Sequence, residues 1–189
     1  PKDKPNVDLN DRTAALLEQL RCRGLRLIVA TGRHPSFIQK RIRKFQFDAV
    51  IGYSGNVVSH GRQEEAAAFS LDMIQAVYTF AQNHPGLEMT LYSDQGIACT
   101  DRICDLNGVA DFLIGDIRKV TTMQVSRICL HLDRWELYPG IKSKFQIRFP
   151  GYRLVKTGDK QAEVLAQGRS KASEILRLAH SLGISADQI

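Results

Sequence analysis

The stretch RLIVATGR, residues 26–33, decides our interpretation of the fold. Its apolar residues 27–30 predict a buried strand that ends in a small hydroxyl, a glycine and an arginine. Ligands of open α/β sheets collect beyond the carboxyl ends of the strands. There Thr31 can donate to a phosphate oxygen, Gly32 lets the backbone approach, and Arg33 can grip an anion with two N–H groups. We predict an anion site here, with an ordinary strand-end turn as the alternative.

Helical and strand patterns alternate around this stretch. A helix is expected at 10–23, capped by Asn10 or Asp11 and stopped by Gly24, before a strand at 25–30. Its core-facing stripe should consist of Leu16, Leu17 and Leu20. A second helix, opened by Pro35, should present free N–H groups to the anion, and a strand should follow at 47–52. Such tight alternation predicts parallel pairing in a doubly wound α/β layer.

The pattern changes near residue 60, where strands begin to dominate. A helix at 70–83 precedes the strands, which are expected at 87–93, 96–100, 125–133, 145–149 and 152–156. This composition predicts a mixed α+β insert with a largely antiparallel sheet. From residue 162 the chain returns to a strand, a loop and a helix at 170–182. The inward residues of this helix are expected to be Ile175, Leu176, Ala179 and Leu182. The predicted domains are 1–66 with 161–189, and 67–160.

Two further loops could carry chemistry. GYSGNVV, residues 52–58, is a second glycine-containing loop at a strand end, although a plain turn would explain it equally. GRSKASEIL, residues 168–176, places Lys171 at the start of a helix, where a cation is poorly placed against the helix dipole. A surface lysine is the simpler explanation. A lysine that neutralises clustered negative charge would also explain the position.

Together, RLIVATGR, AVIGYSGNVV and the segment AEVLAQGRSKASEILRLAHSLGISADQI resemble the haloacid dehalogenase (HAD) superfamily. Within it, the order of motifs is similar to that of Cof-type phosphatases, in which a large α/β cap separates the second and third motifs. The resemblance covers nearly the whole chain. It implies an α/β fold with a Rossmann-like HAD core, incomplete in this chain, and an inserted α+β cap domain.

The resemblance also assigns roles to individual residues. Thr31 becomes the hydroxyl that binds the transferring phosphoryl group, and Lys171 the cation that steadies nucleophile and phosphate. Gly32 and Arg33 would contact phosphate or substrate. The family usually has Asn-Gly where this chain has Ser54 and Gly55, so these two and Asn56 are expected on the substrate side only.

The family's first motif, D-x-D-G-T, and its fourth, G-D-x-x-N-D, do not occur in this chain. They supply the nucleophile, the acid/base and carboxylates for Mg²⁺. The chain is therefore expected to be either a piece of a working phosphatase, which we favour, or a relative that has lost catalysis, and inactive by itself. The implied reaction is magnesium-dependent hydrolysis of sugar phosphates or small phosphorylated metabolites through an aspartyl-phosphate. The alternative is a non-catalytic module that binds anions or nucleic acid.

The net charge of +6 raises the question of a nucleic-acid partner. The densest basic run is RHPSFIQKRIRKF, residues 33–45. A helix here would place Ile38, Ile42 and Phe45 on one side and most charges on the other. The charged residues are Lys40, Arg41, Arg43 and Lys44. No aromatic residues interleave them in a recognised nucleic-acid module, which favours a solvated helix face over a nucleic-acid contact.

The remaining composition is that of an ordinary globular protein, with 43% hydrophobic and 24% charged residues. No apolar run approaches a membrane span and no signal-peptide pattern occurs, so we expect no membrane partner. The four cysteines, which form no C-x-x-C pair, are Cys22, Cys99, Cys104 and Cys129. This spacing favours free thiols, buried or half-buried, in a reducing, cytoplasmic setting.

Overall fold

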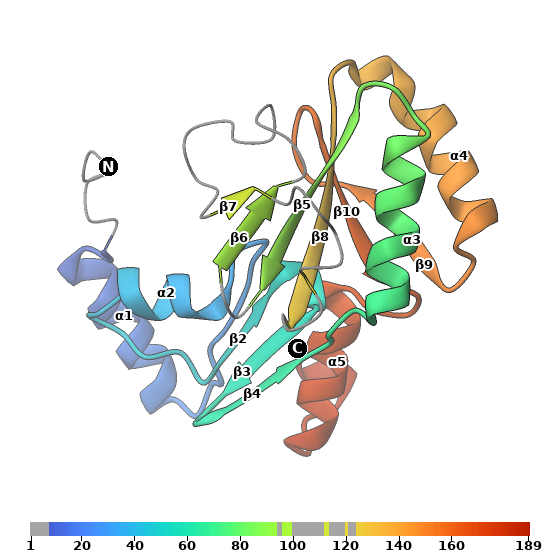
Figure 1. The fold of residues 1–189 in the computed structure, drawn as a ribbon. Coiled ribbons are helices and arrows are strands. Elements are labelled where there is room, and N and C mark those ends of the chain that lie inside the picture. Colours follow the sequence, from blue (N-terminus) through green and yellow to red (C-terminus); the bar gives the residue numbers. More distant parts are fainter. Residues whose placement is uncertain (1–7, 94–95, 100–111, 114–119, 121–123) are drawn as a thin grey trace. The chain divides into compact units, whose positions relative to one another are not determined.

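The computed structural model describes residues 8–93, 96–99, 112–113, 120 and 124–189, and the chain divides into two compact units. The first unit comprises residues 1–66 and 169–189, and the second comprises residues 67–168. Figure 1 shows the elements of both units along the chain. The mixed α/β class predicted from the sequence is confirmed, with parallel pairing in the first unit and a largely antiparallel sheet in the second.

The first unit is built on a four-stranded sheet in the order β1-β2-β3-β4. Its strands are β1 (Ile28–Ala30), β2 (Ala49–Gly52), β3 (Val57–His60) and β4 (Gln63–Ala66). The β1–β2 pair is parallel, with Ile28 opposite Ala49, as the tight strand–helix–strand pattern requires. The other two pairs are antiparallel. β2 is buried along its whole length, so it forms the centre of this sheet.

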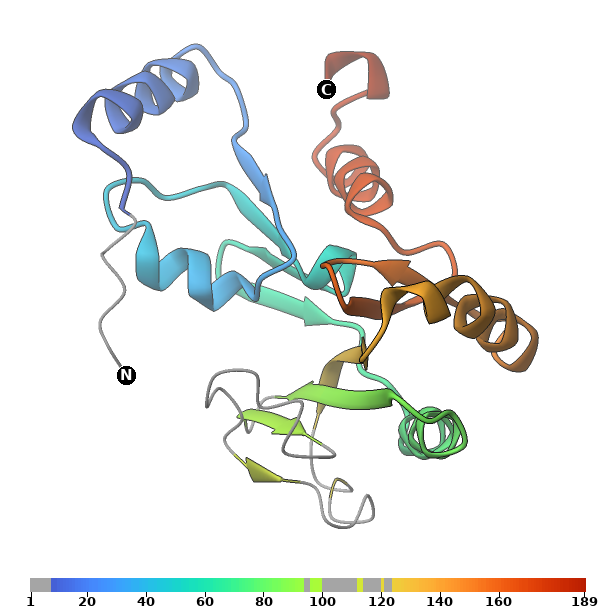
Figure 2. The same ribbon diagram turned by 90° about the horizontal axis from the view of Figure 1, so that it is seen from above.

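The helices of the first unit are α1 (Asp11–Cys22), α2 (Pro35–Arg41) and α5 (Lys171–Ser181). Figure 2 shows α1 and α2 on one side of the four-stranded sheet and α5 on the other. Asn10 caps α1, accepting the N–H of Thr13 at 2.8 Å, as predicted. The expected core-facing stripe of α1 is wrong: Leu17 is half-buried, but Leu16 is 51% exposed and Leu20 is exposed as well. This helix buries no residue completely among the described parts of the chain.

The inward face of α5 also differs from the expected one. Leu176 is 51% exposed, whereas Glu174, Leu178 and Ala179 are buried. Glu174 and Leu178 are four residues apart and therefore lie one above the other on the same helix face. The sequence did not predict Glu174 on the inward face, because charged residues are seldom fully buried unless they are paired.

The basic run forms a shorter helix than expected. α2 ends at Arg41, since Ile42 has an extended backbone with φ −103° and ψ 93°. Phe45 is nevertheless buried, and Ile38 and Ile42 are half-buried, so the predicted apolar side of the run exists. Lys44 forms an ion pair with Asp11 at 2.6 Å on the exposed side. Part of the basic charge is thus balanced within the unit.

The second unit contains a six-stranded sheet in the order β7-β6-β5-β8-β10-β9. Its strands are β5 (Leu87–Ser93), β6 (Gly96–Cys99), β7 (Phe112–Leu113), β8 (Val125–Leu132), β9 (Tyr152–Lys156) and β10 (Gln161–Ala166). All neighbours are antiparallel except β6 and β7. The predicted strand at 96–100 is present, but Thr100 lies outside the described residues.

Two helices, α3 (Leu71–Gln82) and α4 (Tyr138–Arg148), lie along one side of this sheet (Figure 1). The predicted strand at 145–149 is wrong, because residues 145–148 complete α4 and Phe149 is its C-cap. The spacing of four between Ile141, Phe145 and Phe149 puts all three on one helix face, and all three are buried. The Phe145 ring lies 5.6 Å from that of Phe80 on α3. These contacts join both helices to one apolar core.

The second unit extends further than the sequence suggested. We expected residues 161–168 to return to the first unit, but β10 pairs with β8 and β9 instead. Val164, for example, is opposite Ile128 on one side and Leu154 on the other. An apolar strand such as AEVLA fits either sheet by composition, and only its long-range pairing distinguishes them.

No described helix has both the length and the apolarity needed to cross a membrane. Two cysteines are free thiols in the described parts of the chain. Cys129 is buried, and this burial raises the pKa of its thiol to about 12. Cys22 is exposed, contrary to expectation. Cys104 lies outside the described residues, as does the side chain of Cys99.

Candidate functional site

Thr31 directly follows β1 and is held there by backbone hydrogen bonds. Its N–H donates to the carbonyl of Ile51 at 2.8 Å, and its carbonyl accepts the N–H of Ser54 at 3.2 Å. The hydroxyl Oγ1 accepts the N–H of Arg33 at 3.2 Å, which leaves the hydroxyl proton available as a donor. Thr31 is half-buried. The predicted position at the carboxyl end of a parallel strand therefore exists.

The rest of this loop supports part of the prediction. A Cβ on Gly32 would meet no atom within 4 Å, so open space adjoins the backbone at this position. The Arg33 guanidinium lies 4.2 Å from the centre of the Phe37 ring and is exposed. The free N–H groups expected at the start of α2 are not free: Ser36 N–H donates to His34 Nδ1 and Phe37 N–H to the His34 carbonyl. The start of α2 therefore adds less to an anion site than predicted.

His34 is a further titratable group of this loop. It is half-buried, and burial lowers the pKa of its imidazole. Glu64, whose Oε1 lies 3.6 Å from His34 Nε2, opposes this shift by raising the pKa. The Nδ1 acceptor role toward Ser36 fits the neutral ring. His34 thus caps a helix rather than adding a charge to the loop.

The second loop has a strained backbone. Tyr53 and Ser54 have φ values of 45° and 56°, which side chains other than glycine rarely adopt. Gly55 has φ 114°, and a Cβ there would lie 2.7 Å from the Ser170 carbonyl carbon. Asn56 is 1% exposed, and neither Oδ1 nor Nδ2 of its amide has a hydrogen-bond partner within the described residues. Strain and an unsatisfied buried amide are features that functional sites retain at a cost in stability.

Lys171 is the first residue of α5. Ser170 caps this helix by accepting the Ser173 N–H at 3.0 Å, and Ser173 Oγ accepts the Ser170 N–H at 2.8 Å. Lys171 is exposed, and in the described parts of the chain it has no ion-pair or side-chain hydrogen-bond partner. Its ammonium group is therefore available to an anion.

The three loops are joined by direct contacts within the first unit. The Thr31 loop is bonded to Ser54, and the close approach of Gly55 to Ser170 brings in the residue next to Lys171. The structure thereby connects the loops that carry the predicted residues, and it does so through backbone atoms. A cavity of about 760 Å³ lies elsewhere in this unit, beside Phe45 and His60, and none of the predicted site residues lines it.

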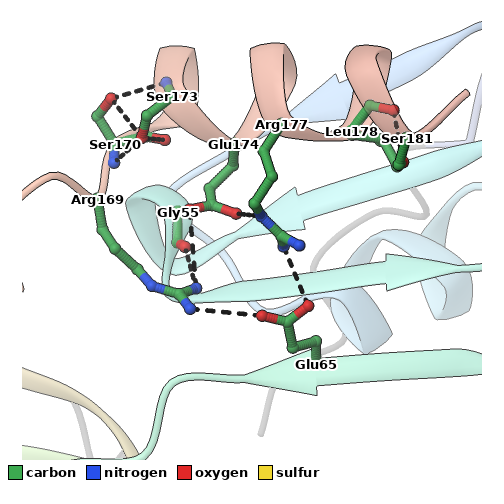
Figure 3. A network of polar contacts seen from close by, with 9 residues as sticks. All are labelled: Gly55, Glu65, Arg169, Ser170, Ser173, Glu174, Arg177, Leu178 and Ser181. Atoms are coloured by element: carbon green, nitrogen blue, oxygen red, sulfur yellow. Dashed lines mark hydrogen bonds and ion pairs between the residues drawn. The ribbon is translucent and has the colours of Figure 1, made fainter. Parts of the chain in front are cut away.

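Charged residues surround the junction of these loops (Figure 3). Arg169 donates from Nη1 to the Gly55 carbonyl at 3.4 Å and forms ion pairs with Glu65 at 3.4 Å and Glu174 at 3.8 Å. Arg177 pairs with the same two carboxylates, at 3.1 Å and 2.8 Å. Glu174 raises the pKa of Arg177 through this hydrogen bond. Sequence analysis missed all four residues, although Arg169 and Glu174 stand within three positions of Lys171.

A sequence model of haloacid dehalogenase-like hydrolases matches residues 4–189. The chain belongs to this family. The resemblance stated from the motifs is thereby confirmed. No curated protein matches the chain.

Several solved structures have the same fold. A protein from Streptococcus mutans has a TM-score of 0.81 at 14% identity, covering 98% of this chain and 74% of its own. A phosphatase of the haloalkanoate superfamily from Bacteroides thetaiotaomicron has a TM-score of 0.76 at 16% identity, with coverage of 96% and 69%. A subclass IIB sugar phosphatase has a TM-score of 0.71 at 16% identity, with coverage of 96% and 72%.

The HAD site in this chain does not fit a magnesium ion by itself. Mg²⁺ needs oxygen ligands with carboxylates among them. No group of three or more His, Cys, Asp or Glu side chains able to hold a metal occurs among the described residues. The nearby carboxylates of Glu65 and Glu174 are instead paired with arginines. The described residues therefore do not form a magnesium site.

Proposed function

We propose that this chain provides the phosphate-binding part of a phosphomonoester hydrolase. The observation that carries the proposal is the joining of the Thr31 loop and the Lys171 loop through residues 53–55, in a chain of the HAD family. Thr31 offers a hydroxyl proton, and Lys171 offers an unpaired ammonium. A hydrogen-bond donor and a cation are what the oxygens of a transferring phosphoryl group require.

The chemistry is two successive displacements at phosphorus. In the reaction that the family resemblance implies, an aspartate attacks phosphorus, the P–O bond to the leaving group breaks, and the alcohol departs with a proton from an acid. Water then attacks the aspartyl-phosphate, releasing inorganic phosphate and regenerating the carboxylate. Thr31 and Lys171 stabilise the phosphoryl oxygens in both steps. Magnesium would be held by carboxylates other than those of Glu65 and Glu174, which are paired with arginines.

The proposed substrate class is supported by the family and by a neighbour of the same fold. We propose sugar phosphates or other small phosphorylated metabolites, since a sugar phosphatase is among the solved structures of the same fold. Arg33, Ser54 and Asn56 are the proposed contacts to phosphate or leaving group. The second unit is proposed to act as a cap that selects the leaving group. The free thiols of Cys22 and Cys129 support a cytoplasmic setting.

The test is phosphate release by the intact protein with Mg²⁺ over a panel of phosphorylated metabolites. Lys171→Ala and Thr31→Ala should each lower kcat about 100-fold or more, as expected for loss of a group that stabilises transition-state charge. Their unfolding transitions should stay near that of the parent. A parent that releases no phosphate from any panel member would refute the catalytic proposal, and a variant with a near-normal rate would remove its residue from the site.

A binding function without turnover is the second candidate, since the carboxylates beside the Lys171 loop, Glu65 and Glu174, are paired with arginines. The chain would then bind inorganic phosphate but release none from any ester. Neutralising Lys40, Arg41, Arg43 and Lys44 distinguishes an anion pocket from a nucleic-acid contact. Only the latter would lose a salt-dependent affinity for nucleic acid.

A further inference from the structure

Glu65, Arg169, Glu174 and Arg177 form a closed ring in which the charges alternate (Figure 3). Each arginine pairs with both glutamates. Glu174 is buried, with 4% of its surface exposed, whereas Arg177 is exposed. A buried carboxylate is stable only where its charge is balanced. The ring supplies that balance with no net charge, so it leaves the positive charge of Lys171 uncompensated.

One member of the ring also contacts the site loops. Arg169 Nη1 donates to the Gly55 carbonyl at 3.4 Å, whereas Arg177 has no hydrogen bond with Gly55. Gly55 in turn lies so close to the Ser170 backbone that a Cβ would be 2.7 Å from it. Arg169 therefore stands between the loop of Ser54 and Asn56 and the loop of Lys171, joined to the first by its side chain and to the second by its backbone.

We propose that Arg169 is a positioning residue of the anion site. Its guanidinium holds the Gly55 carbonyl while Glu65 and Glu174 hold the guanidinium. This arrangement fixes the strained loop of residues 53–56 against the start of α5. The guanidinium presents five N–H donors in one rigid plane, whereas lysine has three donors on a flexible stem and does not hold several acceptors in a fixed geometry. The inference rests on the proposed function, because it assumes that the joined loops bind phosphate.

The ring also offers a matched control. Arg169→Lys and Arg177→Lys keep the charge, and each removes one guanidinium fork from the same two carboxylates. The first alone removes the bond to Gly55. We expect both variants to lower the unfolding transition by a similar amount. Arg169→Lys should in addition weaken binding of inorganic phosphate to the whole chain about tenfold, whereas Arg177→Lys should leave it within about twofold.

Phosphate binding is measured by NMR titration of the parent and both variants. A second readout is amide hydrogen exchange at Ser54 and Asn56, whose N–H groups bond to the carbonyls of Thr31 and Tyr53. Exchange there should be about tenfold faster in Arg169→Lys and unchanged in Arg177→Lys. If the parent binds no phosphate, the proposed function fails, and the exchange readout still decides the positioning role. Equal effects of the two variants on loop exchange, or no effect of Arg169→Lys, would overturn the inference.

Discussion

The two units differ in what lies at their centres. The second unit has one continuous cluster of buried apolar side chains, to which α3, α4 and the strands of its sheet contribute. In the first unit, α1 buries no residue completely within the described chain. Each unit buries a glutamate, Glu174 in the first and Glu163 in the second, so a buried carboxylate does not distinguish them. The first unit also contains the strained turn at Tyr53 and the unsatisfied amide of Asn56.

This difference indicates which unit contributes most to stability and which contains the proposed phosphate-binding loops. Apolar burial stabilises at about 25 cal/mol per Å², whereas a buried polar group without a partner costs about 1–3 kcal/mol. The second unit therefore has the composition of a stable scaffold. The first unit retains unfavourable features at the loops that are proposed to bind phosphate. Three experiments test this contrast.

The largest effect is expected in the apolar core. Phe145 is fully buried and its ring lies against those of Phe80 and Phe149. Phe145→Ala should destabilise the second unit by about 4 kcal/mol. Trp135 is the single tryptophan and belongs to this unit, so its fluorescence during denaturation reports the change. Ile147→Ala on the same helix is the control, because Ile147 is 82% exposed and should change stability by less than about 0.5 kcal/mol.

A smaller loss of stability is expected in the second unit when the pH is lowered. Burial lowers the pKa of His131 from 6.5 to about 4, and the charge of Arg127 adds to this shift. The unfolded chain thus binds a proton at pH values where the folded chain does not. Stability should be fully present above pH 6.5 and should fall as the pH drops toward 4, by up to about 3 kcal/mol in total.

Denaturation of the parent and of His131→Gln between pH 4 and 7 isolates this contribution. The parent should lose more stability than the variant across that range, with a difference in slope near 1.4 kcal/mol per pH unit. Identical slopes would show that His131 does not titrate as described. The same experiment separates His131 from His34, whose pKa is also lowered but which belongs to the first unit.

The smallest effect on stability is expected in the loops of the first unit. Gly55→Ala places a methyl group against Ser170 at a φ of 114° and should cost about 2 kcal/mol. Gly61→Ala is the control, because Gly61 also has a positive φ, 61°, but has open space around it. Hydrogen exchange in β2 measures the stability of this unit. Phosphate binding should weaken only in Gly55→Ala; equal loss in both would mean that the close approach to Ser170 does not matter.

Local patterns predicted most of the fold. The cap of α1, the parallel β1–β2 pair and the position of Thr31 all follow from a few neighbouring residues. The failures at 145–149 and at β10 have a different cause. FQIRF alternates like a strand when taken alone, and only Ile141 reveals the helical spacing. The assignment of β10 depends on pairing with β8, about thirty residues earlier, which no local pattern specifies.

The sequence predicted the loops of the candidate site, but not the long-range contacts of Arg169 that join them. Thr31 and Lys171 stand at a strand end and a helix start, which sequence patterns mark. The bond of Arg169 to Gly55 joins residues 114 positions apart, and that of Arg169 to Glu65 joins residues 104 apart. Contacts at such separation arise from the fold as a whole. The buried, unsatisfied amide of Asn56 likewise becomes visible only when its surroundings are known.

The pair formed by Glu65 and Arg169 also has a consequence for how this chain is assembled. The chain leaves the first unit after Ala66 and returns to it at Arg169, with the 102 residues of the second unit between them. Arg169 forms an ion pair of 3.4 Å with Glu65, the residue before Ala66. The points where the chain leaves and re-enters the first unit are therefore neighbours. An insertion with adjacent ends behaves like a long loop. The inserted unit can be exchanged, lengthened or shortened without a change in the strand order of the four-stranded sheet. A domain attached in this way can diversify while the loops of Thr31 and Lys171 stay in place.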